Sequence, residues 1–137
     1  MTSAISIALS GLTSSTQRLN ASAANIANLQ TIGSLEEGGQ APYSAVTTTS
    51  SAQTVGNGEG AGVVTQIIPK DTPFVPVFSP DSPFADENGV VGVPNVNLAE
   101  EIVNINLAEI TYKANLKTIQ AASDLDKELF RILDQKA

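Results

Sequence analysis

The N-terminal part of the chain repeats apolar or small side chains at alternating steps of four and three, the heptad spacing of a coiled-coil seam. This seam comprises Ile5, Leu9, Leu12, Thr16, Leu19, Ala23 and Ile26. It predicts a helix from Thr2 to about Gln30, which is about 40 Å long at ~1.5 Å per residue. Gly33 follows the seam. We expect it to close the helix, because glycine readily adopts the left-handed conformation found at helix ends.

The C-terminal part returns to the helical period. Heptad steps join Ile102, Ile105, Glu109, Tyr112, Leu116 and Ile119, and after a phase shift the apolar face continues through Ala122, Leu125, Leu129 and Ile132. Asn97 and Glu100 have the spacing of a capping pair. They predict a helix that starts near Leu98 and runs to the end of the chain, or about 60 Å at ~1.5 Å per residue.

Glycine, proline and short β-branched runs dominate residues 34–96. The runs 46–49 and 63–68 predict short strands joined by turns. Closely spaced prolines between 73 and 83 exclude a regular helix and leave an extended path. Its rings, Phe74, Phe78 and Phe84, can fill a small core or cover a neighbour. The glycine-rich stretch 56–62 lacks the lysine of a phosphate loop and is interpreted as a flexible loop.

These patterns predict a mainly α protein with a small β-rich insert. We divide the chain into an N-terminal helix (1–33), a strand-and-loop middle domain (34–96) and a C-terminal helix (97–137), with the two helices forming a coiled-coil-like pair. The middle domain is too short to cover both helices. Assembly with other subunits is therefore expected, since monomers rarely leave long apolar surfaces exposed.

Composition narrows the possible functions. The net charge is −7, with seven Lys and Arg spread along the chain, so no basic surface for nucleic acid is expected. Absence of Cys and His removes common zinc sites, thiol nucleophiles and Ser-His triads. The candidate acids for an enzyme are the pairs Glu100-Glu101 and Asp86-Glu87. Adjacent acids on a helix point about 100° apart and cannot flank one substrate, and both pairs have surface or capping uses. We predict no enzyme activity, no cofactor, no metal and no small-molecule substrate.

Targeting signals are also absent from the pattern. The chain has no run of about 18 apolar residues, so no membrane span is predicted. Its first charge is Arg18, and hydroxyl side chains interrupt the stretch before it, unlike a secretory signal. If the protein leaves the cytoplasm, we expect it to do so uncleaved.

Three collinear motifs carry a resemblance to a known family. They are Asn25-Ile26-Ala27-Asn28 followed by Thr31 and Gly33, Pro94-Asn95-Val96-Asn97 leading to Glu100-Glu101, and Tyr112-Lys113-Ala114-Asn115. Together they resemble the flagellar basal-body rod family, and the second motif is similar to that of its proximal-rod subunit.

The resemblance implies a structural subunit of the periplasm-spanning rod, exported unprocessed by the flagellar type III apparatus. Its partners would be other rod subunits and further copies of itself, with the terminal helices in the wall of a tube and the middle domain facing outward. The alternatives are another axial subunit of the rod or hook type, or a secreted coiled-coil protein. Combining the seams with the motifs, we predict an assembly interface of Ile5, Leu9, Leu12, Leu19, Ala23, Asn25, Ile26, Asn28, Ile102, Ile105, Tyr112, Asn115, Leu116, Ile119 and Leu129.

Overall fold

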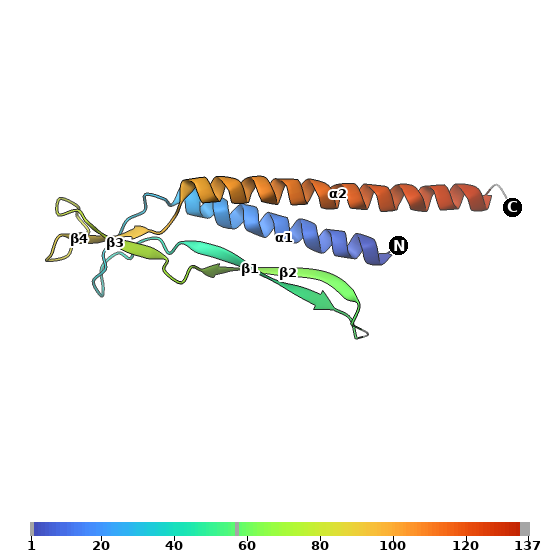
Figure 1. Ribbon diagram of the computed structural model, residues 1–137. Coiled ribbons are helices and arrows are strands. Elements are labelled where there is room, and N and C mark those ends of the chain that lie inside the picture. Colours follow the sequence, from blue (N-terminus) through green and yellow to red (C-terminus); the bar gives the residue numbers. More distant parts are fainter. Residues whose placement is uncertain (1, 57, 135–137) are drawn as a thin grey trace.

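A computed structural model describes residues 2–56 and 58–134. Its elements follow in the order α1 (Thr2–Ala27), β1 (Val46–Thr54), β2 (Gly60–Pro69), β3 (Phe74–Phe78), β4 (Val90–Pro94) and α2 (Leu98–Asp134). The molecule is elongated, with α1 between α2 and the β1–β2 hairpin, and with β3 and β4 at the end where the helices are connected (Figure 1). The predicted fold class, a mainly α protein with two long helices and a small β insert, is confirmed.

The two helices are antiparallel, so the start of α1 and the end of α2 point toward the same end of the molecule (Figure 1). Asn25 bonds to Glu101 near one end of the pair, and Gly11 lies against Asn115 further along. Asn25 and Gly11 are as far apart in sequence on α1 as Glu101 and Asn115 are on α2, so the register between the helices is constant. The start of α1 therefore lies level with about residue 124 of α2. Residues 125–134 of α2 therefore project beyond α1 (Figure 1).

Small side chains form the contact between the helices. Buried small side chains include Ala8, Ser15 and Ser22 on α1 and Ala108 and Ala122 on α2. These side chains recur at multiples of seven residues, so they form a stripe that allows close approach of the two backbones. The larger side chains of the predicted seams are rotated outward from this stripe and are half-buried or exposed.

The predicted start of α2 near Leu98 is correct, whereas the predicted end of α1 near Gln30 is too late. The Asn97 carboxamide oxygen accepts hydrogen bonds from the amides of Ala99 (3.0 Å) and Glu100 (3.4 Å), as expected for a cap. The reciprocal bond, in which the Glu100 carboxylate would accept the Asn97 amide, is not made, and this carboxylate lies 3.9 Å from the Lys70 amine instead. The other helix, α1, ends at Ala27, and a turn follows it.

Gly33 does not close α1 in the left-handed conformation. It pairs instead with Gly92 through two backbone hydrogen bonds of 2.9 and 3.0 Å, which attach this segment to β4. A Cβ at Gly33 would lie 2.3–2.4 Å from backbone atoms of residues 40–42. Glycine is required here by backbone crowding, not by helix termination.

The predicted strands 46–49 and 63–68 lie in the β1–β2 hairpin, paired from Val46 opposite Pro69 to Thr54 opposite Gly60. Gly60 and Gly62 belong to β2, so the predicted loop is shorter than expected. At Gly62, φ is 116°, and a Cβ would meet the Ser10 hydroxyl at 2.2 Å. This close approach lets Ser10 Oγ accept the Val63 amide at 3.0 Å and holds β2 on α1.

β3 and β4 form a second antiparallel pair, from Phe74 opposite Pro94 to Phe78 opposite Val90. Val91 is 1% exposed and is one of the two largest fully buried side chains of the described residues. Phe74 and Phe84 are half-buried, whereas Phe78 is 72% exposed. Two rings therefore contribute to packing and the third remains on the surface.

We expect Gly33→Ala to destabilise the fold by about 1–3 kcal/mol, the usual cost of forcing extra atoms into a packed site. Gly56→Ala is the matched control, because its added Cβ meets no atom within 4 Å. Urea unfolding monitored by circular dichroism measures both. Equal stability of the two variants would contradict the crowding at Gly33.

Amide exchange in the isolated chain should distinguish the projecting part of α2 from the rest. Residues 125–134 have no helix beside them, and an isolated helical segment of this length is marginal in water. We expect their amides to exchange faster than those of residues 101–122, measured by hydrogen exchange with mass spectrometry. Equal protection of the two segments would contradict this prediction.

Candidate assembly interface

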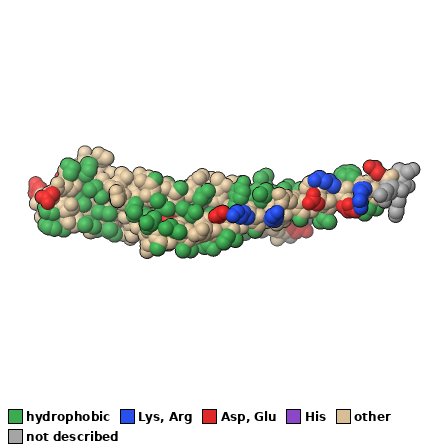
Figure 2. Space-filling model, turned by 90° about the horizontal axis from the view of Figure 1, so that it is seen from above, with side chains coloured by type: hydrophobic (Ala, Val, Ile, Leu, Met, Phe, Trp, Pro, Cys, Tyr) green, Lys and Arg blue, Asp and Glu red, His purple; other side chains and the backbone are tan. Residues whose placement is uncertain are grey.

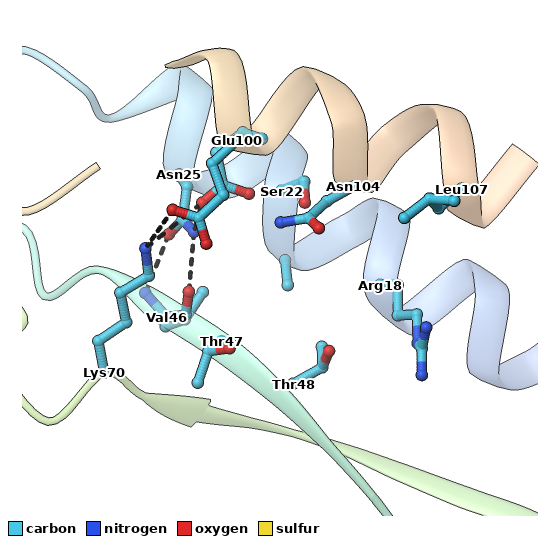
Figure 3. A pocket seen from close by; sticks show the side chains of 12 residues that line it. Arg18, Ser22, Asn25, Val46, Thr47, Thr48, Lys70, Glu100, Asn104 and Leu107 are labelled. Atoms are coloured by element: carbon cyan, nitrogen blue, oxygen red, sulfur yellow. Dashed lines mark hydrogen bonds and ion pairs between the residues drawn. The ribbon is translucent and has the colours of Figure 1, made fainter. Parts of the chain in front are cut away.

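A polar groove of about 280 Å³ lies between α1, α2 and β1 (Figure 3). Arg18 and Asn104 line it from the two helices, Thr47 and Thr48 line it from β1, and Lys70 closes one end. Its lining is rich in hydroxyl, amide and charged groups. Such a groove is poorly suited to burial against an apolar partner, because its polar groups would lose their access to water.

Asn25 is the centre of a buried hydrogen-bond network at this groove. Its side chain is 1% exposed. The amide nitrogen donates to Glu101 Oε1 (2.7 Å) and to the Val46 carbonyl (2.8 Å). The amide oxygen accepts from the Val46 amide (2.9 Å) and from the Tyr43 hydroxyl (3.2 Å). Asn25 therefore uses its full hydrogen-bonding capacity within the chain and links α1 to β1 and α2.

The surroundings of Asn25 bury the acid Glu101 and half-bury the phenol of Tyr43. Glu101 is 2% exposed, and its carboxylate lies 3.8 Å from the Lys70 amine in addition to accepting the Asn25 bond. Burial, followed by the nearby negative charge of Glu101, raises the pKa of Tyr43 above its ordinary value. A tyrosine hydroxyl is protonated at neutral pH even at its ordinary pKa, and the raised pKa extends its hydrogen bond to Asn25 further into the alkaline range.

The second groove, here called the apolar groove, is formed by α1 and α2 alone. It has a volume of about 500 Å³ and is lined by Ser15, Thr16, Leu19, Ile105, Ala108, Glu109, Tyr112, Lys113 and Leu116. Its only charged members, Glu109 and Lys113, form an ion pair with each other, and the hydrogen bond from Lys113 lowers the pKa of Glu109. The remaining side chains offer a surface for apolar burial.

The apolar groove brings together several of the predicted interface residues from both ends of the chain. Leu19, Tyr112 and Leu116 are 40–42% exposed along it. Ile105 is half-buried in the same groove. Of the remaining apolar residues predicted for the interface, Ile5, Leu12, Ile26 and Ile119 are half-buried, whereas Leu9, Ala23, Ile102 and Leu129 are exposed.

The three predicted asparagines make contacts within the chain. Asn25 is buried in the network described above. Asn28 donates to the Ala24 carbonyl (2.9 Å) one turn earlier in the sequence. Asn115 donates to the Thr111 carbonyl (2.9 Å) and packs on Gly11. Their assignment to an interface with other subunits stays a prediction.

A further apolar flank of α2 was missed at the sequence level. Val103, Leu107 and Ile110 are 52–64% exposed and follow steps of four and three, so the same periodicity could have revealed them. Seen from the side of α2, apolar side chains extend along the molecule, while Lys, Arg, Asp and Glu gather mainly over the half that contains the end of α2 (Figure 2). On the face seen in this view, the other half carries fewer charged side chains and so has less electrostatic protection against association.

Within residues 2–56 and 58–134, no group of three or more acidic side chains has the arrangement of a metal site. In the same ranges, neither helix is both long and apolar enough to cross a bilayer. The features that distinguish the surface are therefore the polar groove with its buried network and the apolar faces of the helix pair.

Comparison with known proteins identifies the class. Residues 87–132, which contain β4 and most of α2, match the family model described as the C-terminal part of the flagellar basal body rod FlgEFG proteins. This match and the paired terminal helices place the chain among flagellar rod proteins.

Relatives define the family within that class. The chain is 36% identical over 120 residues to the flagellar basal-body rod protein FlgC of Yersinia enterocolitica, with 87% of each chain covered. It is 35% identical over 127 residues to FlgC of Agrobacterium fabrum (91% and 89% covered) and 30% identical to FlgC of Aquifex aeolicus (93% and 90% covered). The chain belongs to the FlgC family of flagellar basal-body rod proteins.

Proposed function

We propose that this chain is a structural subunit of the proximal rod that polymerises through its terminal helices and catalyses no reaction. The main support is the distribution of apolar side chains on α1 and α2. Small residues make the contact between the helices, while large ones such as Leu19, Ile102 and Leu107 remain 42–52% exposed on the outside. An exposed apolar surface of this kind is typical of a subunit that is completed by its neighbours.

The candidate acids for catalysis have structural contacts instead. Glu101 is buried against Asn25, and Glu100 lies near Lys70. Asp86 Oδ1 accepts the amides of Asn88 (2.8 Å) and Val90 (2.7 Å) and so forms the turn before β4. These contacts support a role in holding the fold together, without a small-molecule substrate or cofactor.

In the proposed rod, the three segments of the chain, divided at residues 33 and 96, occupy different positions. The segments 1–33 and 97–137 pack against other rod subunits and further copies of the chain. The segment 34–96 stays on the outside of the rod. The position of the β3–β4 end, far from the chain termini, supports this arrangement (Figure 1).

Isolation of basal bodies tests the proposed function directly. We expect the chain to be present in purified basal bodies and its deletion to abolish motility. Absence from basal bodies, together with a stable dimer on size-exclusion chromatography of the purified chain, would favour the secreted coiled-coil alternative.

The proposed export route makes a separate prediction. We propose delivery through the flagellar type III apparatus without cleavage, because the early part of α1 is needed in the fold: Ala8 is 2% exposed, and Gly11 packs on Asn115. The intact mass of the chain from basal bodies should retain this segment. A shorter chain that begins beyond Gly11 would contradict uncleaved export.

A further inference from the structure

The projecting end of α2, residues 125–134, is amphipathic apart from Phe130, which is 67% exposed and lies between its two sides. One side carries Leu125, Leu129, Ile132 and Leu133, which follow the i, i+4, i+7, i+8 pattern of a helix face. These four side chains are 46–62% exposed, and no part of α1 lies beside them. The other side carries Asp124, Lys127, Glu128 and Arg131, whose contacts are ion pairs among themselves.

Such a pattern is the recognition signature of a helix that binds in an apolar groove. The apolar groove matches it in length. Along α2, the groove extends from Ile105 to Leu116, about 16 Å at ~1.5 Å per residue, and the projecting end is about 15 Å long. The Glu109–Lys113 pair at the groove offers one charge of each sign to the mixed charges of the projecting end.

The groove and the projecting end of one molecule cannot meet. Both belong in part to the same straight helix, and Leu116 and Leu129 are about 20 Å apart along its axis at ~1.5 Å per residue. A second molecule is therefore needed to bring the two surfaces together.

We propose that the projecting end of α2, residues 125–134, docks into the apolar groove of a second copy of this chain. The inference rests on the proposed function and names the contact through which copies join. Because the two surfaces differ, the contact is heterologous. Each molecule keeps one free groove and one free end, so a contact of this type continues from copy to copy until a ring closes or the series ends.

Cysteine cross-linking in assembled rods tests the contact, since the chain contains no cysteine. The variant Leu116→Cys/Leu129→Cys has one thiol in the groove and one on the apolar side of the projecting end. A disulfide requires Cα atoms less than about 7 Å apart, so the two thiols of one molecule cannot react with each other. In the matched control, Lys117→Cys/Leu129→Cys, the first thiol moves by one residue to an exposed position outside the groove.

We expect oxidised basal bodies from the first variant to yield disulfide-linked dimers and larger multimers of the chain, and the control to yield monomers. Peptide mass spectrometry should join the segment around 116 to the segment around 129. If the first variant is not incorporated, Leu19→Cys/Leu133→Cys tests the same contact from the α1 side of the groove.

Two results would overturn the inference while leaving the proposed function intact. One is normal rod content with monomers only, and the other is a cross-link to a different rod subunit. Absence of the unmodified chain from basal bodies would instead contradict the proposed function itself.

Discussion

Replacing Leu19 by Asp is expected to abolish incorporation of the chain into the rod while leaving its fold intact. Leu19 is 42% exposed in the apolar groove, so the isolated chain loses little packing when it is replaced. In an assembled rod, the change removes the burial of the exposed part of the side chain, worth about 1 kcal/mol. It also buries a carboxylate in a groove whose cation, Lys113, is already paired with Glu109, and this costs several kcal/mol more. The penalty recurs at every copy.

Asn20→Asp is the matched control for this prediction. It introduces the same charge one residue further along α1, at an exposed position that does not line the groove. We expect Asn20→Asp cells to swim and to contain normal amounts of the chain in their basal bodies, and Leu19→Asp cells to do neither. Normal swimming of Leu19→Asp cells would show that the apolar groove is not an assembly surface.

Asn25→Ala is expected to cause the largest loss of stability among substitutions of polar residues on α1. The change deprives the buried Glu101 carboxylate of its 2.7 Å bond. It also removes the donor to the Val46 carbonyl and the acceptor of the Val46 amide and the Tyr43 hydroxyl. Loss of one partner of a buried charge costs about 3–5 kcal/mol. Because the Lys70 amine remains 3.8 Å from Glu101, we expect the lower end of that range.

The control is Asn28→Ala, which removes an asparagine just past the end of α1. Its amide nitrogen donates to the Ala24 carbonyl and its amide oxygen accepts from the Thr31 hydroxyl. We expect a loss of about 1 kcal/mol for these local bonds. Urea unfolding of both purified variants gives the comparison. If both variants unfold at the same urea concentration, the network around Asn25 does not hold α1, β1 and α2 together.

The two helices and the strand-rich insert could be predicted because their signals are local. Heptad steps and the Asn97 cap define the helices, and the β-branched runs define the hairpin. The rotation of the helices could not be predicted, because the contact is made by Ala8, Ser15 and Ser22, whose small or polar side chains do not stand out in an apolar pattern. Close approach of two backbones is a property of the pair and is not encoded in either helix alone.

The candidate site also contains residues that could be predicted from local patterns and residues whose contacts could not. Leu19, Tyr112 and Leu116 were predicted as interface residues from periodicity, and the structure places them along one groove. Asn25 was selected through a family motif, but its four hydrogen bonds depend on residues far away in the sequence that the chain reversal brings together. The role of Gly33 also depends on such a contact, because its partner Gly92 lies in β4.

The buried network around Asn25 lies near one end of the helix pair, and this position has a mechanical consequence. From Glu101 to Asp134, α2 is about 50 Å long at ~1.5 Å per residue. Because α1 supports α2 only as far as about residue 124, a sideways force on the projecting end acts first on the small-residue contacts nearest that end, such as Ala122. The bonds that join Asn25, Val46 and Glu101 lie at the opposite end of the pair. When torque strains the shaft, the helix pair of this subunit should therefore open from the projecting end, and the network should be the last contact to yield.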